Sequence, residues 1–194
     1  MFERIRHDFN VYGRSWRHRA LWAMALYRFG QWGERQRLQP LRWLLGKIYG
    51  FCAVFAPIIT GVAIDRAMKI GEKFHIVHPG MVVIHPGAVF GNRCGIMHNV
   101  TIGQNMNSGV PVFGNDVFIG AGAVVLGDIR IGDGACIASN SLVISDVPVN
   151  AMAMGVPAKV YPNMGMYRSA VVGSLPSATP AAGETNDVSR KAAS

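Results

Sequence analysis

Bulky apolar residues recur at every sixth position through the middle of the chain, and small or turn-forming residues fill most of the positions between them. A six-residue period of this kind is typical of a β-helix, in which each unit is a short strand followed by a tight turn. One unit cannot bury its apolar residue alone, so the units must stack as coils. The pattern therefore predicts an all-β solenoid over residues 61–162, with these apolar residues pointing to its axis: Ile84, Phe90, Ile96, Ile102, Phe113, Ile119, Val125, Ile131, Ile137 and Val143.

The period breaks at two places. The step from Ile76 to Ile84 is eight residues instead of six, and His78 lies in the added stretch. The second break follows Ile102, where about five extra residues interrupt the register and predict an extruded loop. His98 stands just before that loop, twenty residues after His78. A coil of three hexapeptides has eighteen residues, so we expect the two histidines about one coil apart on one side of the solenoid.

The segment before the repeat, residues 1–60, is predicted to be helical, basic and apolar, with helices over residues 20–30 and 41–55. Residues 1–47 hold ten basic against three acidic side chains, which is +7 of the formal net charge of +8, and they hold all four tryptophans. Such a segment can cap the open end of the solenoid or make peripheral contact with an anionic membrane, and the two interpretations are compatible. The uncharged stretch of 17 residues from Ile48 to Ile64 contains Pro57 and is short for a membrane span, which takes roughly 20 residues.

Composition bounds the compartment and the partners. The three cysteines are scattered without metal-ligand spacing, which predicts a reducing compartment and no metal site. Two of them, Cys94 and Cys136, fall inside the repeats and are expected to be buried small side chains. The N-terminus lacks a signal-peptide pattern, so we expect a cytoplasmic protein. The basic charge comes with no nucleic-acid reader motif, so no nucleic-acid partner is expected. Residues 163–194 are predicted to be a mobile tail.

Six short motifs follow one another over about half of the chain: FHIVH at 74–78, MVVI at 81–84, NVTIG at 99–103, IGAGA at 119–123, VLG at 125–127 and GVPAK at 155–159. This ordered set resembles the serine acetyltransferase branch of the hexapeptide acyltransferases. The resemblance implies a left-handed parallel β-helix, a homotrimer with sites between neighbouring subunits, and acetyl-CoA as the co-substrate.

The chain also departs from that branch. Val77 stands where serine acetyltransferases have an aspartate before the histidine, Ala63 stands where they have the aspartate that pairs with it, and about Val110 stands in place of a second histidine. In its short length, basic N-terminus and paired histidines the chain more closely resembles exopolysaccharide and capsule sugar O-acetyltransferases of the colanic-acid type. This resemblance predicts acetyl transfer to a sugar hydroxyl, with a carbohydrate acceptor. Serine, another small acceptor, or a catalytically inactive scaffold remain alternatives.

Acetyl transfer to a hydroxyl needs a base, and imidazole suits that role because its ordinary pKa lies near working pH. His78 is the expected general base, and His98 is a second catalytic or substrate-binding group or a histidine in a turn. The resemblance implies that Gly103 lies beside the thioester, that Ala121 and Ser139 line the pantetheine arm, and that Lys159 lies near the CoA phosphates. Each of these also fits an ordinary repeat position. The residues expected to bind the acceptor are Asn99, Gln104 and His85.

Overall fold

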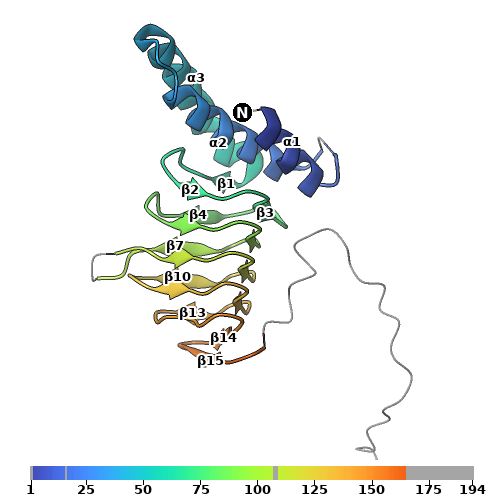
Figure 1. Ribbon diagram of the computed structural model, residues 1–194, viewed down its shortest axis with the longest axis vertical. Coiled ribbons are helices and arrows are strands. Elements are labelled where there is room, and N and C mark those ends of the chain that lie inside the picture. The colour runs from blue at the N-terminus through green and yellow to red at the C-terminus, as the bar shows by residue number, and fades with distance from the viewer. Residues whose placement is uncertain (1, 16, 107–108, 165–194) are drawn as a thin grey trace, which may run out of the picture.

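The computed structural model describes residues 2–15, 17–106 and 109–164. Within these ranges the chain starts with three helices and continues as a stack of short strands (Figure 1). The helices are α1 (Phe2–Val11), α2 (Arg19–Glu34) and α3 (Gln39–Thr60). The mobile tail predicted for 163–194 lies, from residue 165 on, outside the described residues.

The strands are short, mostly of two or three residues, and separated by tight turns. They are β1 (Val62–Ala63), β2 (Lys69–Ile70), β3 (His75–Ile76), β4 (Val82–Ile84), β5 (Val89–Phe90), β6 (Gly95–Ile96), β7 (Thr101–Gly103), β8 (Val112–Phe113), β9 (Phe118–Ile119), β10 (Val124–Leu126), β11 (Arg130–Ile131), β12 (Cys136–Ile137), β13 (Leu142–Val143), β14 (Met152–Gly155) and β15 (Ala158–Tyr161).

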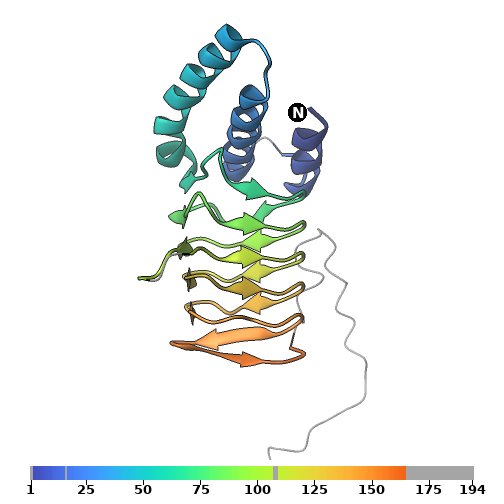
Figure 2. The same cartoon turned by 60° about the vertical axis from the view of Figure 1, so that its left-hand side comes forward.

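Every third strand pairs in parallel with its equivalent in the next coil, which produces three flat faces. The described strands form a five-stranded face β1-β4-β7-β10-β13, a four-stranded face β11-β8-β5-β2 and a six-stranded face β15-β14-β12-β9-β6-β3. Figure 2 shows the coils stacked as parallel rungs. The β-solenoid prediction is therefore confirmed. The last pair, β14 and β15, is antiparallel and ends the stack as a hairpin.

The apolar residues of the repeat stack in columns inside the coils. Ile76 pairs with Ile96, which pairs with Ile119, and all three are buried. In another column the rings of Phe90 and Phe113 stack with centroids 4.4 Å apart. Each coil thus buries its side chains only against the coils above and below it, as the repeat predicts.

One corner of the coils shows why the turns tolerate few residue types. Arg93, Asp116 and Gly134 occupy equivalent positions, and all three have positive φ angles, between 57° and 68°. The charged side chains at the first two positions form an ion pair of 2.6 Å between neighbouring coils. Glycine and asparagine adopt this left-handed conformation at low cost, which explains their abundance in the repeat.

The first two helices cap the open end of the solenoid. From α2, Leu21, Met24 and Tyr27 are buried in the same apolar core as the first coil. The hydroxyl of Tyr27 donates to the carbonyl of Met68 at 2.9 Å and accepts from the amide of Ile70 at 3.1 Å. The cap therefore supplies partners for backbone groups that the end of a parallel stack leaves open.

The third helix is packed quite differently. Tyr49 and Thr60 are the only buried residues of α3, and Figure 1 shows the helix rising away from the coils. It is longer than predicted because it continues through Pro57 to Gly61, whose left-handed φ of 74° ends it. Trp22 and Trp43 are not buried in the cap, since they are 53% and 66% exposed.

Candidate functional site

Four of the predicted site residues form one column at a corner of the solenoid. The strand register aligns Ile76, Ile96, Ile119 and Ile137 across β3, β6, β9 and β12. Two residues further along each coil, the same register stacks the column His78, His98, Ala121 and Ser139. Two histidines at the N-terminal end of the column are thus followed by two small side chains.

The first break in the repeat explains the exposure of His78. Val83 pairs with Thr101, so the next strands are again in register after this corner. The His98 coil turns the corner with the single residue Asn99, whereas the His78 coil uses the three residues 79–81. This wider turn leaves His78 exposed, and it places Gly80 over His98, which is half-buried. The amide of Asn99 donates to the carbonyl of Gly80 at 2.8 Å and joins the two turns.

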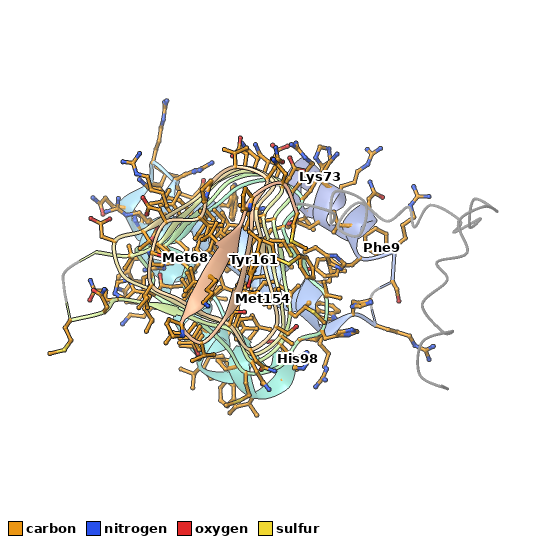
Figure 3. All side chains as sticks on the ribbon, turned by 90° about the horizontal axis from the view of Figure 1, so that it is seen from below. Phe9, Met68, Lys73, His98, Met154 and Tyr161 are labelled. Carbon is orange, nitrogen blue, oxygen red and sulfur yellow. The ribbon has the colours of Figure 1, made fainter. Side chains whose placement is uncertain are left out.

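The two histidine rings contact each other edge to face. Their centroids lie 6.1 Å apart with an interplanar angle of 60°, as expected from the twenty-residue spacing. Figure 3, which views the stack of coils from below along its axis, places His98 at the outer edge of the stack. The Nδ1 atom of His98 is buried and has no hydrogen-bond partner in the described part of the chain. Both histidines of the pair belong to the same chain.

Two carboxylate residues of the first coil, Asp65 and Glu72, make their hydrogen bonds away from His78. Asp65 uses its Oδ1 atom to accept from the amide of Ala67 at 2.7 Å, in a turn at another corner. The exposed Glu72 lies at the turn between β2 and β3, where its amide donates to the side chain of Asn92. The contact of the His78 side chain is with the ring of His98.

His75 is close in sequence to His78 but belongs to the cap. Its ring meets that of Tyr12 edge to face with centroids 5.2 Å apart, and the Tyr12 hydroxyl accepts from the amide of Ile76 at 3.0 Å. Burial, with smaller contributions from His18 and His78, lowers the pKa of His75. This histidine supports the junction between the first coil and the N-terminal helices.

Gly103 and His85 lie at the opposite edge of the five-stranded face from the histidine column. Ile84 pairs with Ile102, so His85 stacks on Gly103, at the far ends of β4 and β7. The Nδ1 atom of His85 accepts from the amide of Gly87 at 3.0 Å in a local turn. The exposed Gln104 begins the loop that the second break predicts. One chain therefore does not bring these residues to the histidines.

Lys159 lies at the C-terminal end of the stack. It is exposed on β15 and pairs with Met154 across the terminal hairpin. Because Ile137 pairs with Ala153, the neighbouring Gly155 continues the column below Ser139. The amide of Gly155 donates to the hydroxyl of Ser141 at 3.2 Å. The column thus runs from two histidines, past small side chains, towards a cation.

Sequence reasoning missed two contributors to this corner. Gly80 lies over His98, and a side chain added at Gly80 would come within 3.7 Å of the His98 Cβ atom. Tyr12 fixes the backbone of the strand that leads to His78. The register break could have pointed to Gly80. Tyr12 carried no local signal, because its contact joins residues 64 positions apart.

The comparisons with known proteins agree on one class. The bacterial transferase hexapeptide family, described as six repeats, matches residues 111–145. A serine acetyltransferase of Synechococcus elongatus is 35% identical over 152 residues, which are 77% of this chain and 57% of the relative. The crystal structure of Neisseria gonorrhoeae serine acetyltransferase has a TM-score of 0.67 at 29% identity, covering 82% of this chain and 64% of that one. A serine acetyltransferase in complex with CoA has a TM-score of 0.63 at 29% identity, covering 74% and 57%. The chain thus spans about three fifths of the length of these relatives.

The predicted sugar acceptor is wrong. The relatives are named serine acetyltransferases, and none of those reported above is an exopolysaccharide or capsule enzyme. Asn99 and Gln104 lie at opposite ends of β7, so one chain alone does not bring these two predicted acceptor-binding residues together. Asn99 has a φ of 56°, so its residue type is explained by the turn.

The repeat and the stacked coils agree with the matched family and with these relatives. The predicted resemblance to hexapeptide-repeat acyltransferases is therefore confirmed: the family model matches residues 111–145, and the named relatives are serine acetyltransferases.

Proposed function

We propose that this protein is an acetyl-CoA-dependent O-acetyltransferase with L-serine as its acceptor. The observation that carries the proposal is the column His78, His98, Ala121 and Ser139, which places candidate bases at one end of a strip of small side chains. The named relatives supply the acceptor, and the structure of a relative with CoA supports the co-substrate. As in the sequence prediction, the expected location is the cytoplasm, where acetyl-CoA is available.

His78 acts as the general base. It is the exposed member of the histidine pair, so a hydroxyl group can reach it. It takes the proton of the serine hydroxyl while the oxygen attacks the thioester carbonyl and forms the new ester bond. As the carbon–sulfur bond breaks, the protonated imidazole returns the proton to the leaving thiolate, so the base is regenerated. His98, in edge contact with the ring, holds His78 in place.

The small residues of the column suit a long, thin acyl carrier. Ala121, Ser139 and Gly155 present little side chain over successive coils, and Lys159 stands at the end of the strip. From β6 through β9, β12 and β14 to β15 there are four steps between strands, or about 19 Å at a spacing of ~4.8 Å. We assign the pantetheine arm to this strip and the CoA phosphates to Lys159.

The active form is a homotrimer. His98 and Gly103 are five residues apart, on opposite edges of one face, and this stretch extends to about 17 Å. A site that uses both the histidine corner and the Gly103 edge, with Gln104 and His85 beside it, needs the second edge from a neighbouring subunit. The exposed apolar side chains Met81 and Val83, on and beside the five-stranded face, suit burial between subunits. Closed cyclic symmetry then gives equivalent sites.

The test of the reaction is the release of free CoA with identification of the ester product. The purified protein is expected to convert acetyl-CoA and L-serine to O-acetylserine. His78→Ala should lower kcat by about 10²–10⁴-fold, the range for general acid–base catalysis. His7→Ala is the matched control, because His7 is an exposed histidine on α1, outside the column. Full turnover by the His78 variant, or no transfer to L-serine by the folded trimer, would disprove the proposal.

The test of assembly is sedimentation of an interface variant. Val83 is the middle residue of β4 on the five-stranded face, and its side chain is 56% exposed. Val83→Arg should therefore separate the subunits without disturbing the buried columns. The expected result is a folded monomer with no acetyl transfer. An active monomer would contradict the shared site.

A further inference from the structure

The outer side of α3 is an apolar stripe that no described part of the chain covers. Four residues on the face turned away from α2 are half or more exposed: Leu44 at 50%, Phe51 at 70%, Val54 at 67% and Ile58 at 79%. They recur at intervals of seven, three and four positions, so they lie in one line along the helix. We call this line the α3 outer face. By length and composition, α3 is the one helix among the described residues that could cross a membrane.

The approach to the α3 outer face is strongly basic. Arg35, Arg37, Arg42 and Lys47 are exposed, and residues 35–60 contain no aspartate or glutamate. The Lys47 ammonium lies 5.8 Å from the centre of the exposed Trp43 ring. An apolar helix face with a tryptophan and cations, and with no acidic group, is the composition of helices that lie in the interface of an anionic membrane.

A groove of about 600 Å³ between α2 and α3 adds to this basic surface. Arg42, Lys47 and Arg66 line it together with Glu34, whose carboxylate is 2.8 Å from Arg66. Three cations against one carboxylate leave the groove positive. Trp43 and Lys47 of α3 also line this groove.

The charges decide between lying on a membrane and crossing it. The uncharged part of α3, residues 48–60, is 13 residues long and spans only about 20 Å of helix. The hydrocarbon core is about 30 Å thick, so a spanning helix would draw Lys47 and Arg42 into it. A helix that lies in the interface keeps those cations at the lipid headgroups.

We propose that α3 binds the protein to the surface of an anionic lipid membrane, with its outer face in the interface and the basic residues on the headgroups. A second copy of the chain is the less favourable occupant, because a two-fold interface places the same patch on both sides. Two such patches would bring together uncompensated cations, whereas anionic lipid supplies the opposite charge. The inference does not depend on the reaction that the coils catalyse.

The experiment is flotation of the full chain with phosphatidylcholine vesicles, with and without phosphatidylglycerol. Binding is expected only with the anionic lipid, and salt should weaken it. Tryptophan emission should shift to the blue when these vesicles are added, and Trp43→Phe should remove most of the shift. The double variant Arg42→Glu with Lys47→Glu should lower partitioning at least about 25-fold, since each cation near the surface contributes about fivefold.

The apolar contribution is tested by Phe51→Ser with Ile58→Ser, which should lower partitioning at least about tenfold. Val149→Ser and Arg130→Glu are the matched controls, because they change an exposed apolar residue and an exposed cation on the coils. Both controls should bind vesicles like the unchanged protein. Equal binding to neutral and anionic vesicles would overturn the proposal. The proposal would also be overturned if the protein did not bind vesicles and Phe51→Ser with Ile58→Ser changed the oligomeric state. That result would make the α3 outer face an interface between copies of the chain.

Discussion

Replacement of Arg28 by methionine tests how the helical cap is fixed to the first coil. Arg28 is 3% exposed, and its guanidinium lies 3.2 Å from the carboxylate of Asp8, which is 1% exposed. It also donates to the carbonyls of Ile70 at 3.3 Å and Gly71 at 2.9 Å. One side chain thus joins α1, α2 and the first coil. Arg28→Met keeps most of the apolar volume and removes all of these donors.

The size of the effect at neutral pH follows from the carboxylate that remains. Removing one partner of a buried ion pair costs about 3–5 kcal/mol of unfolding free energy, because the other charge stays buried without compensation. Asp8 can escape by taking a proton. At pH 7, protonation of a carboxyl with an ordinary pKa near 3.9 costs about 4 kcal/mol. This cost is an upper limit for the electrostatic part of the lost unfolding free energy.

The same reasoning gives the pH dependence. Burial raises the pKa of Asp8 above its ordinary value even with Arg28 beside it, which opposes the shift. A raised folded pKa means that the contribution of Asp8 to stability is fully present below its unfolded pKa and is lost as pH rises through the folded pKa. At pH 5 protonation costs only about 1.5 kcal/mol. The loss caused by Arg28→Met should therefore shrink by about 2–3 kcal/mol between pH 7 and pH 5.

The assay is denaturant unfolding followed by tryptophan emission, which reports on the cap because all four tryptophans lie in residues 1–47. The control is Asp8→Asn combined with Arg28→Met, which removes the buried charge. It should be more stable at pH 7 than Arg28→Met alone, and its loss should depend on pH less than the loss caused by Arg28→Met. A loss below about 1 kcal/mol for Arg28→Met, or an equal loss at both pH values, would refute the role of the buried pair.

Three further outcomes are expected. Burial raises the pKa of the Cys94 thiol to about 12 and that of the Cys136 thiol to about 11. Only the exposed Cys52 should therefore react with a thiol reagent at pH 8 before the protein unfolds. Equally fast labelling of Cys94, detected by mass spectrometry, would contradict this. Gly91→Ala should lower the free energy of unfolding by about 1–3 kcal/mol, because the added Cβ would meet the backbone of Gly114. Gly103→Ala should cost far less, since the nearest atom to its added Cβ, on Leu126, is 3.5 Å away. Equal unfolding midpoints of the two variants would disprove this. Val77→Asp should lower the KM for L-serine with little change in kcat. The half-buried Val77 precedes His78, and a carboxylate at this position can bind the ammonium group of serine. An unchanged KM would show that serine is held elsewhere.

The solenoid was predictable from the sequence because its physics is local. Each hexapeptide buries one apolar side chain and turns on small residues, so the period specifies the columns without knowledge of distant contacts. The two breaks in the six-residue period are equally local, so they predicted the wider turn at residues 79–81 and the loop after β7. The packing of the N-terminal helices was not readable in this way. Leu21, Met24 and Tyr27 form the cap, while Trp22 and Trp43 of the same segment are more than half exposed. Apolar spacing alone does not say which stripe of a helix meets the coils.

The candidate site shows a sharper limit. Ala121 and Ser139 occupy turn positions where a coil needs small residues, so an identical sequence would arise with or without a pantetheine arm over it. His78 and His98 occupy the same column but are large, polar and not required by the turn. The proposed function of the column therefore rests on the residues that depart from the repeat, and the distance of Gly103 from the histidines becomes evident only when the strand register is known.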